Sequence, residues 1–174
     1  MMALTHAAIA LIAWAAWSRS DLSDESNYID YPSAAKVAGE SCTVKPGSVY
    51  DGDTLRVLCG REELKIRMCG IDAPETDQPG GIESRDYLRS LLPDNQQVAV
   101  VRVETDRYGR TVAEIWNDEL TETDPNINAA MVLAKQAWHY EQYSGNCPNG
   151  GAIATAAQIA GTPPGVAPWE WRRR

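Results

Sequence analysis

The sequence predicts an α+β domain, a small β-barrel of five short strands with a helix inserted after the third strand. Several short segments alternate polar and apolar residues with a period of two, as half-buried strands do. One segment among them repeats its apolar residues at helical spacing instead. Short strands separated by turn residues are typical of small closed barrels.

Five segments are expected to form the strands, and they span residues 43–50, 54–59, 63–71, 97–103 and 111–116. The first segment is a weak strand, because Pro46 and Gly47 interrupt it. Asp51-Gly52 is typical of a two-residue hairpin turn, which would join the first two strands. Five strands with a helix after the third favour a barrel of the oligonucleotide-binding (OB) type.

Two segments are expected to form helices. Residues 81–92 carry apolar side chains at roughly 3.6-residue spacing, and the proline that follows stops the helix. Asp124-Pro125 is expected to open a second helix that runs to about Ala137, because Asp caps helices and Pro suits the first turn. The tail beyond Tyr143 is rich in Gly, Ala and Pro.

Two segments are expected to precede this domain, which covers residues 41–174. Residues 1–18 contain no Lys, Arg, Asp or Glu, and their apolar run is shorter than the roughly 20 residues that span a bilayer. This favours a secretion signal and a secreted or periplasmic protein. An uncleaved membrane-associated segment and a wrongly assigned start codon are the alternatives. Residues 19–40 are polar and are expected to form a linker.

The composition limits how the protein could meet a nucleic acid. It has 16 Lys and Arg against 24 Asp and Glu, which gives a net charge of −8. A sequence-independent nucleic-acid binder usually presents a basic face to the phosphates. An acidic chain that acts on phosphates must concentrate its cations at one site, or bind a metal ion. Its two histidines are too few for a His-rich metal cluster.

The four cysteines suit an oxidised, exported chain and lack the C-x-x-C spacing of a zinc knuckle. If Asp51-Gly52 is a hairpin turn, the numbers of facing residues add up to about 103. Cys42 would then lie nearly opposite Cys59, which leaves Cys69 to pair with Cys147. Free thiols are the alternative.

Four carboxylates could converge near the first hairpin: Asp51, Asp53, Asp72 and Glu75. Asp53 starts the second strand and Asp72 ends the third, and these ends face each other in an antiparallel hairpin. Two close carboxylates repel each other, and a hard cation removes the repulsion. Oxygen ligands on loops suit calcium, since magnesium demands stricter geometry and zinc prefers nitrogen and sulfur. The alternative for Asp51 and Asp53 is that they are ordinary turn residues.

Two arginines could complete a phosphate site. Arg67 lies five residues before Asp72, and Arg110 closes the turn at residues 106–109. A planar guanidinium matches the charge that develops on phosphate oxygens during attack, so the two arginines and a cation would form an electrostatic clamp. Glu75 is placed to deprotonate a water molecule. Each of the three could instead be an ordinary surface residue.

Together these residues resemble the thermonuclease, or staphylococcal nuclease, family. The resemblance runs from about Cys42 to the end of the chain, and the following segments carry it: VYDGDTLRV (49–57), KIRMCGIDAPE (65–75), TDRYGRTVAEIW (105–116), NAAMVLAKQAWHYEQY (128–143) and PWEWR (168–172). It implies a five-stranded OB-type barrel with about three α-helices. It also implies a Ca²⁺-dependent, sequence-non-specific nuclease that cuts DNA and RNA at the 5′ P–O bond and leaves 3′-phosphates. The substrate would be single-stranded or locally melted, and the enzyme a monomer without an obligate protein partner.

The resemblance also assigns roles to single residues. Asp53 and Asp72 match the calcium carboxylates, and Ala73 matches a position that contributes its backbone carbonyl, where the family often has Thr. Glu75 matches the proposed general base, while Arg67 and Arg110 match the phosphate-binding arginines.

Four further residues match the substrate-binding periphery of the family. Arg107 and Tyr108 match positions that touch a terminal phosphate. Tyr140 and Tyr143 fall near base-stacking tyrosines, and plain core packing is the alternative for both. The loop after Glu75 is short and lacks a lysine cluster, and the chain is acidic, so substrate binding is expected to be weaker and more salt-sensitive. A barrel that binds nucleic acid or protein without catalysis is the alternative function.

Overall fold

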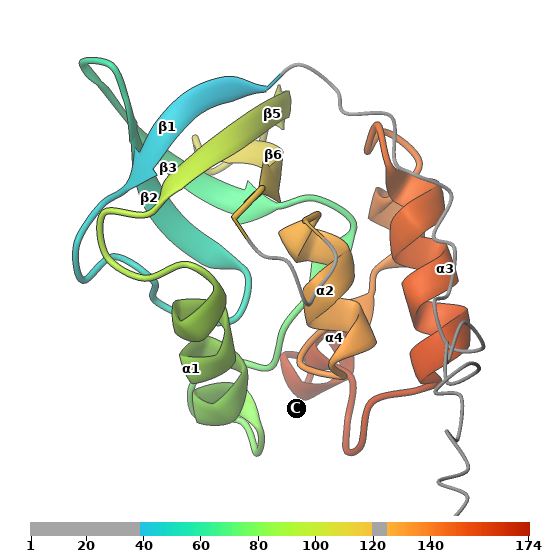
Figure 1. Cartoon of the computed structure of the whole chain (residues 1–174). Helices are drawn as coiled ribbons and strands as arrows, with labels where there is room; N and C mark the ends of the chain where they lie inside the picture. The colour runs from blue at the N-terminus through green and yellow to red at the C-terminus, as the bar shows by residue number, and fades with distance from the viewer. Residues whose placement is uncertain (1–38, 120–124) are drawn as a thin grey trace, which may run out of the picture. The chain divides into compact units, whose positions relative to one another are not determined.

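The computed structural model describes residues 39–119 and 125–174, which form a barrel with helices on one side (Figure 1). The elements in chain order are β1 (Glu40–Val44), β2 (Thr54–Cys59), β3 (Glu62–Met68), β4 (Ile71–Asp72), α1 (Gly81–Leu91), β5 (Gln97–Thr105), β6 (Thr111–Trp116), α2 (Ile127–Leu133), β7 (Trp138–His139), the 3₁₀ turn η2 (Glu141–Tyr143), α3 (Gly150–Ala160) and α4 (Pro168–Trp171). Five strands close the barrel in the order β1-β2-β3-β6-β5, and β4 pairs with β7 in a separate two-stranded sheet. The predicted fold class is confirmed.

The central strands follow from their alternating residues. Strand β2 buries Leu55 and Val57, while β3 buries Leu64, Ile66 and Met68 in the same core. The predicted bounds of β2 and β6 are the observed ones, and β5 runs two residues longer than predicted. For β2 the alternation reflects burial, because burying one face of a strand fixes its register, whereas the last four residues of β6 are all buried.

The third predicted strand was expected to run unbroken to residue 71, and this was wrong. It breaks after Met68, where Gly70 adopts a φ of 72°, a conformation that favours glycine. The chain then leaves the barrel and resumes as β4, which pairs with β7 through Ile71–His139 and Asp72–Trp138. Asp72 therefore lies on a separate two-stranded sheet instead of at the end of a barrel strand.

The first strand and its hairpin also differ from the prediction. Strand β1 ends at Val44, and residues 45–53 form a longer connection in place of a two-residue turn. Pro46 and Gly47 end the strand, because Pro removes a ladder donor and Gly47 has a φ of 67°. The Ser48 hydroxyl replaces part of the ladder, since it donates to the carbonyl oxygens of Lys45 (2.6 Å) and Arg56 (2.9 Å).

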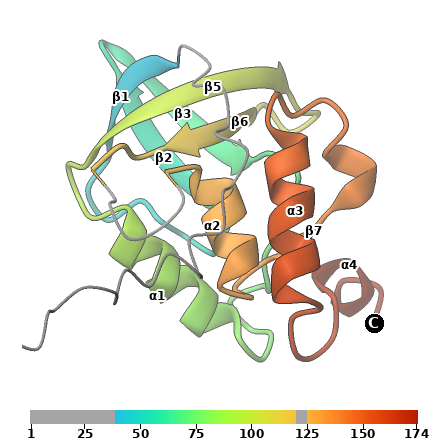
Figure 2. The same cartoon turned by 45° about the vertical axis from the view of Figure 1, so that its right-hand side comes forward.

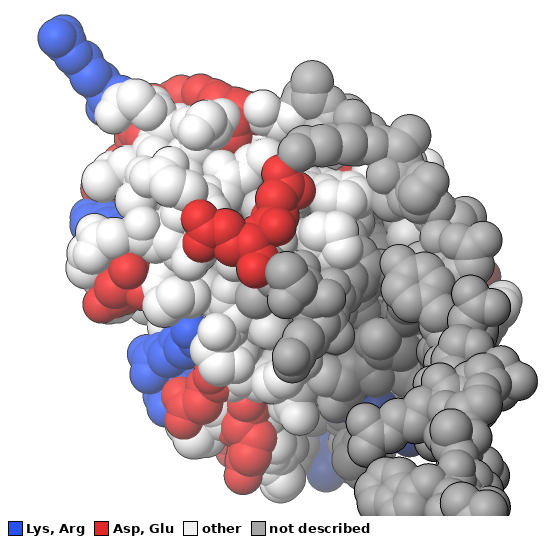
Figure 3. All heavy atoms as spheres, viewed as in Figure 1, with Lys and Arg blue, Asp and Glu red and all other residues white. Residues whose placement is uncertain are grey.

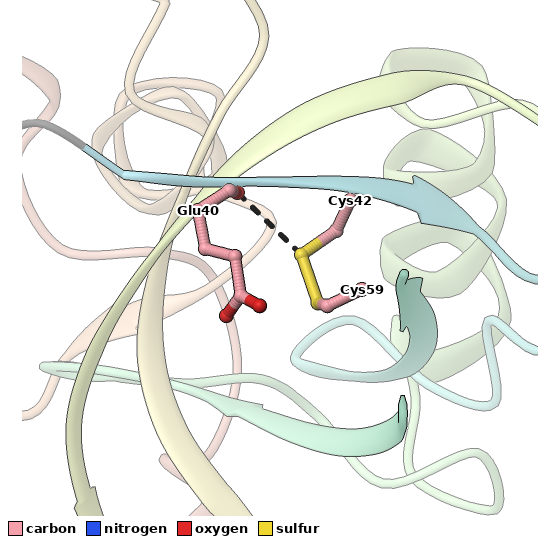
Figure 4. A group of neighbouring side chains, drawn as sticks. All are labelled: Glu40, Cys42 and Cys59. Atoms are coloured by element: carbon pink, nitrogen blue, oxygen red, sulfur yellow. Dashed lines mark hydrogen bonds between the residues drawn. A yellow bond between two sulfur atoms is a disulfide. The ribbon is translucent and has the colours of Figure 1, made fainter. Parts of the chain in front are cut away.

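Both predicted disulfides are present, Cys42–Cys59 and Cys69–Cys147. In the observed register Thr43 faces Leu58, so the hairpin partners add up to 101 and Cys42 lies next to Cys59. Figure 4 shows Cys42 and Cys59 bonded beside Glu40. The ligand atoms of these three residues lie within 4.8 Å of one another, but the disulfide removes both thiolates from metal binding.

Helix α2 begins later and ends earlier than predicted. Asp124 lies outside the described residues, and Asn126 is the N-cap, with its side-chain oxygen accepting from the Ala129 N–H at 3.1 Å. The helix ends at Leu133 because Lys135 takes a left-handed φ of 58°. Helix α1 ends one residue before the predicted bound.

Helix α3, which the residue pattern did not predict, packs beside α2 (Figure 2). The alanine-rich helix is anchored to the rest of the domain at its N-terminal end. The buried Glu114 carboxylate of β6 accepts hydrogen bonds from the backbone N–H (2.6 Å) and the side-chain amide (2.7 Å) of Asn149. The Cys69–Cys147 disulfide holds the same end of the helix. With α1 and α2 it makes up the three longer helices that the resemblance implies.

None of the helices within residues 39–119 and 125–174 is long and apolar enough to cross a membrane. The expected signal segment at residues 1–18 and the linker up to residue 38 lie outside the described residues.

The two disulfides are expected to stabilise the fold unequally. A crosslink that closes a longer loop removes more entropy from the unfolded chain, and the two loops span 17 and 78 residues. Loop entropy predicts a loss of about 3 kcal/mol for C42A/C59A and about 4.5 kcal/mol for C69A/C147A. Urea unfolding of both double variants measures the difference, and an equal or smaller loss for C69A/C147A would contradict this account.

Candidate active site

A cleft of about 640 Å³ opens beside the barrel between β2, β4, the turn that joins β5 to β6, η2 and α4. All ten residues that the sequence singles out line it, namely Asp53, Arg67, Asp72, Ala73, Glu75, Arg107, Tyr108, Arg110, Tyr140 and Tyr143. Asp51, Asn146 and Arg172 line it as well. The structure therefore brings the expected residues together in one place.

Two buried aspartates and one arginine form the floor of the cleft. Asp53 is 5% exposed and Asp72 is 1% exposed. The Arg67 guanidinium lies between them, with Nη1 2.6 Å from Asp53 Oδ2 and Nη2 2.7 Å from Asp72 Oδ1. Strand β3 supplies Arg67, while the carboxylates come from the start of β2 and from β4. The hairpin argument thus brings the correct residues together, although Asp72 reaches them from a separate sheet.

The backbone packs closely around this floor. The Ala73 N–H donates to Asp53 Oδ2 at 2.7 Å, and the Asp53 N–H donates to Asp51 Oδ1 at 3.0 Å. Gly52 allows this approach, because a Cβ there would collide with the Ser84 hydroxyl of α1 and lie 2.7 Å from the Ala73 Cβ. Any larger residue at position 52 would push the two acidic loops apart.

Burial raises the pKa of two of the aspartates at this end of the cleft. Burial raises the pKa of Asp72, although the arginines at positions 172 and 67 oppose the rise. Burial and the neighbouring Asp53 charge raise the pKa of Asp51 to about 7. A cation stabilises the charged form of close carboxylates, so a further positive charge would stabilise this site.

The donor set fits a hard divalent cation. Carboxylate oxygens of Asp53 and Asp72 converge, and the backbone carbonyl of Ala73 lies next to Asp72 in the chain. Oxygen donors of this kind suit calcium or magnesium. Arg67 Nη1 is buried at 2.6 Å from Asp53 Oδ2, in an ion pair whose angle is poor for a hydrogen bond. A phosphate oxygen is an acceptor that this group could use.

Glu75 lies on the loop after β4, where its carboxylate contacts Arg172 at 2.7 Å. Gln78 shapes this loop, because its backbone N–H donates to the Glu75 carbonyl oxygen (2.9 Å) and its side-chain oxygen accepts from the Glu75 N–H (3.3 Å). Gly81 is required where α1 begins, since a Cβ there would collide with the Glu75 carbonyl. The short loop is thus held rigidly against the helix.

Arg110 lies across the cleft, at the turn before β6. Its Nε donates to Asp106 Oδ2 at 2.7 Å, and its backbone N–H donates to the other carboxylate oxygen at 2.9 Å. Although burial alone would raise it, these bonds hold the pKa of Asp106 below its ordinary value. The guanidinium groups of Arg107 and Arg110 lie 4.8 and 5.5 Å from the centre of the Tyr108 ring. Tyr108 is 68% exposed, so this cluster is open to a ligand.

Two tyrosines form one wall of the cleft. The Tyr140 ring stacks on the Trp169 ring of α4, with the ring centroids 5.1 Å apart and an angle of 3° between the planes. The centroid of the Tyr143 ring lies 4.6 Å from that of Tyr140. Tyr143 is 60% exposed, so it is not a core residue.

His139, in the neighbouring strand β7, is half-buried, and its Nε2 lies 3.0 Å from the Ser144 hydroxyl oxygen. Burial lowers the pKa of this histidine.

Arg172 is the residue that the sequence interpretation missed. It follows α4 and contacts both Asp72 and Glu75. The ending PWEWR was noted as a family segment, but no pattern indicated where the arginines after it would lie. Asp51 was named among the converging carboxylates and then left out of the expected metal ligands.

Basic side chains are otherwise dispersed over the surface. On the face in Figure 3, the visible Lys and Arg side chains of the described residues form separate groups among acidic ones and no continuous basic track. Outside the cleft several arginines are neutralised locally, as Arg102 is by Glu40 and Glu62. On this face of the molecule (Figure 3), the described residues offer a polyanion no continuous basic surface.

The sequence of this cleft matches that of known proteins. A family model described as "Staphylococcal nuclease homologue" matches residues 65–161. Protein ParB of Escherichia coli is 34% identical over 153 residues, which cover 82% of each chain. This chain belongs to the staphylococcal nuclease family.

Two further relatives carry the name of an activity. The micrococcal nuclease of Shigella flexneri is 34% identical over 141 residues, or 72% of this chain and 77% of the relative. The thermonuclease of Staphylococcus hyicus is 40% identical over 82 residues, or 42% of this chain and 48% of the relative. The protein is therefore a nuclease, a hydrolase that acts on phosphodiester bonds.

Proposed function

We propose that this nuclease is calcium-dependent and sequence-non-specific, and that it cuts DNA and RNA at the 5′ P–O bond to leave 3′-phosphates. The observation that carries the proposal is the convergence of Asp53, Asp72 and Arg67 at contact distance on the cleft floor. The cleft is lined mainly by charged and aromatic side chains, which suit backbone phosphates and the faces of any base. It suits single-stranded or locally melted substrate, and the monomer is expected to act without an obligate protein partner.

Each residue of the cleft has a distinct task in this reaction. Asp53, Asp72 and the Ala73 carbonyl would hold the cation, which supplies positive charge beside the attacked phosphate. Arg67 and Arg110 bind the phosphate oxygens on which charge develops. Glu75 takes a proton from the attacking water, whose oxygen bonds to phosphorus as the bond to the 5′ oxygen breaks. The departing 5′ oxygen takes a proton from solvent water, so the products are a 3′-phosphate and a 5′-hydroxyl.

Both arginines must change partners for this to happen. Arg67 is held by two aspartates and Arg110 by Asp106. Each arginine would exchange carboxylate oxygens for phosphate oxygens, which are charged acceptors of the same kind. Asp106 also holds Arg110 close to its working position, because it bonds both the side chain and the backbone.

Arg67→Ala and Glu75→Gln should each lower kcat for single-stranded DNA by roughly two to four orders of magnitude. Arg67→Ala removes charge stabilisation, and Glu75→Gln removes the proton acceptor. The measurement is cleavage of single-stranded DNA with calcium, and then with a chelator. Arg56→Ala and Glu63→Gln are the matched controls, because these two residues pair with each other on the barrel away from the cleft. Cleavage by the wild type that persists in chelator would refute calcium dependence.

Tyr143→Ala should weaken binding of single-stranded DNA by about 1–3 kcal/mol and raise KM, because an exposed ring offers a face for a base. Stability should be unaffected, since the ring is 60% exposed. Tyr140→Ala should lower stability as well, because Tyr140 stacks on Trp169. Fluorescence anisotropy and thermal melting together separate the two roles. A Tyr143→Ala variant with unchanged KM would show that this ring packs without touching substrate.

We further propose that the protein is exported. The two disulfides support this, because such bonds persist in oxidising compartments. N-terminal sequencing of protein recovered outside the cytoplasm should find a start near residue 19. An intact Met1 on membrane-bound protein would instead indicate an uncleaved anchor, and reduced thiols in cytoplasmic protein would argue against export altogether.

A further inference from the structure

Arg172 occupies the space where the metal carboxylates and the general base meet. Its Nη2 lies 2.6 Å from Asp72 Oδ2, and its Nη1 lies 3.3 Å from Asp72 Oδ1 and 2.7 Å from Glu75 Oε1. The proposed mechanism gives this residue no role. It nonetheless contacts two of the groups on which that mechanism depends.

The C-terminal segment is fixed so that it delivers Arg172 to this point. The buried side chain of Gln78 donates to the Val166 carbonyl oxygen at 2.6 Å, which ties the segment to the Glu75 loop. Trp169 stacks on Tyr140, and Pro168 is buried at the start of α4. The backbone is therefore anchored on both the catalytic loop and the aromatic wall, while the long side chain can still move.

Both oxygens of Asp72 already accept hydrogen bonds from arginines, so a cation that binds this carboxylate competes with them. Arg67 bonds its Oδ1, and Arg172 bonds its Oδ2 and lies near Oδ1. Arg67 is proposed to move to the phosphate only when substrate binds, so a cation that arrives before substrate competes with whichever arginine is released more easily. The side chain of Arg172 is 41% exposed and that of Arg67 is 15% exposed, so Arg172 is the one that can leave at lower cost.

The charge balance favours the same exchange. Asp53, Asp72 and Glu75 contact only Arg67 and Arg172 among the cationic side chains that the structure describes, which leaves one negative charge in excess. A divalent cation reverses that excess and repels the guanidinium that shares Asp72. The displaced guanidinium then lies in a cleft that receives a polyanion.

We propose that Arg172 is a third phosphate-binding arginine of this site, held on Asp72 and Glu75 until a cation takes its place on Asp72. The inference rests on the proposed metal-assisted function and deepens it. Without metal the arginine neutralises the carboxylates, and with metal its guanidinium turns to a phosphate oxygen of the substrate. The same side chain thus weakens metal binding and strengthens substrate binding.

The test measures the two effects separately on the full chain. Titration calorimetry with calcium alone should show that Arg172→Met binds calcium roughly three- to tenfold more tightly than wild type, because its competitor is gone. At saturating calcium the same variant should lose at least about tenfold in kcat/KM on single-stranded DNA, mainly through KM. Arg172→Lys keeps the charge but not the two-pronged contact, so its calcium affinity and its kcat/KM should both lie between those of the wild type and Arg172→Met.

Arg173→Met is the matched control, because this neighbouring arginine is exposed and does not line the cleft. It should leave both quantities unchanged. If Arg172→Met binds calcium no more tightly than the wild type, the proposed exchange is wrong. A variant that binds calcium more weakly and also has a lower melting temperature would show that Arg172 has a purely structural role, and this would overturn the exchange as well. Unchanged kcat/KM would overturn the phosphate role. If the wild type fails to cleave DNA, the proposed function fails, while the calcium titration still decides whether Arg172 competes with the cation.

Discussion

The contact of Arg67 with Asp53 and Asp72 is the interaction on which the rest of the site depends. Two carboxylates that are almost fully buried would repel each other and resist ionisation without it. Loss of one member of such a buried group typically costs about 3–5 kcal/mol, because charge is left uncompensated. The protein thus holds two carboxylates close together in a buried place by supplying positive charge between them.

The surrounding structure holds these three residues in place. Asn128 of α2 donates to the Cys69 carbonyl oxygen at 2.8 Å and accepts from the Ile115 N–H at 3.0 Å. The Cys69–Cys147 disulfide fixes the same turn to the start of α3. Because this turn directs the chain out of the barrel into β4, helices remote from the chemistry determine where Asp72 lies. Tyr108 and Tyr143, which are proposed to contact substrate, are exposed and under weaker constraint.

The sequence predicts those parts of this fold in which the local pattern and the tertiary environment agree. The bounds of β2 follow from alternation, because Arg56 and Leu58 are less buried than Leu55, Val57 and Cys59. The bounds of β6 were also predicted correctly, although its last four residues are all buried. The first hairpin and the start of α2 were mistaken because Asp-Gly and Asp-Pro are only local signals. In the first case the Ser48 hydroxyl bonds allow a longer connection, and in the second Asn126 offers a cap closer to the packed residues. Helix α3 depends on Glu114 and a disulfide, which come from distant parts of the chain.

In the candidate site, too, some residues could be predicted from the sequence and others could not. Asp53 and Asp72 could be brought together from hairpin geometry, and Arg67 could be assigned to the same site as a phosphate-binding residue, but its contact with both aspartates was not predicted. The position of Arg172 could not be predicted either, since it depends on how Gln78 and Tyr140 anchor the C-terminal segment. A short helix near the end of a chain carries no periodic signal that indicates its neighbours. The pairing of Asp72 with a residue 100 positions away is a property of the folded molecule alone.

A pair of crystal structures, grown with calcium and with a chelator, tests the central claim most directly. This account predicts a calcium ion bound by Asp53, Asp72 and the Ala73 carbonyl oxygen at roughly 2.3–2.6 Å. The ion should be absent in chelator, where Arg67 should bridge the two aspartates. A calcium-grown crystal with no ion between these carboxylates, and with their arginine contacts unchanged, would contradict the account.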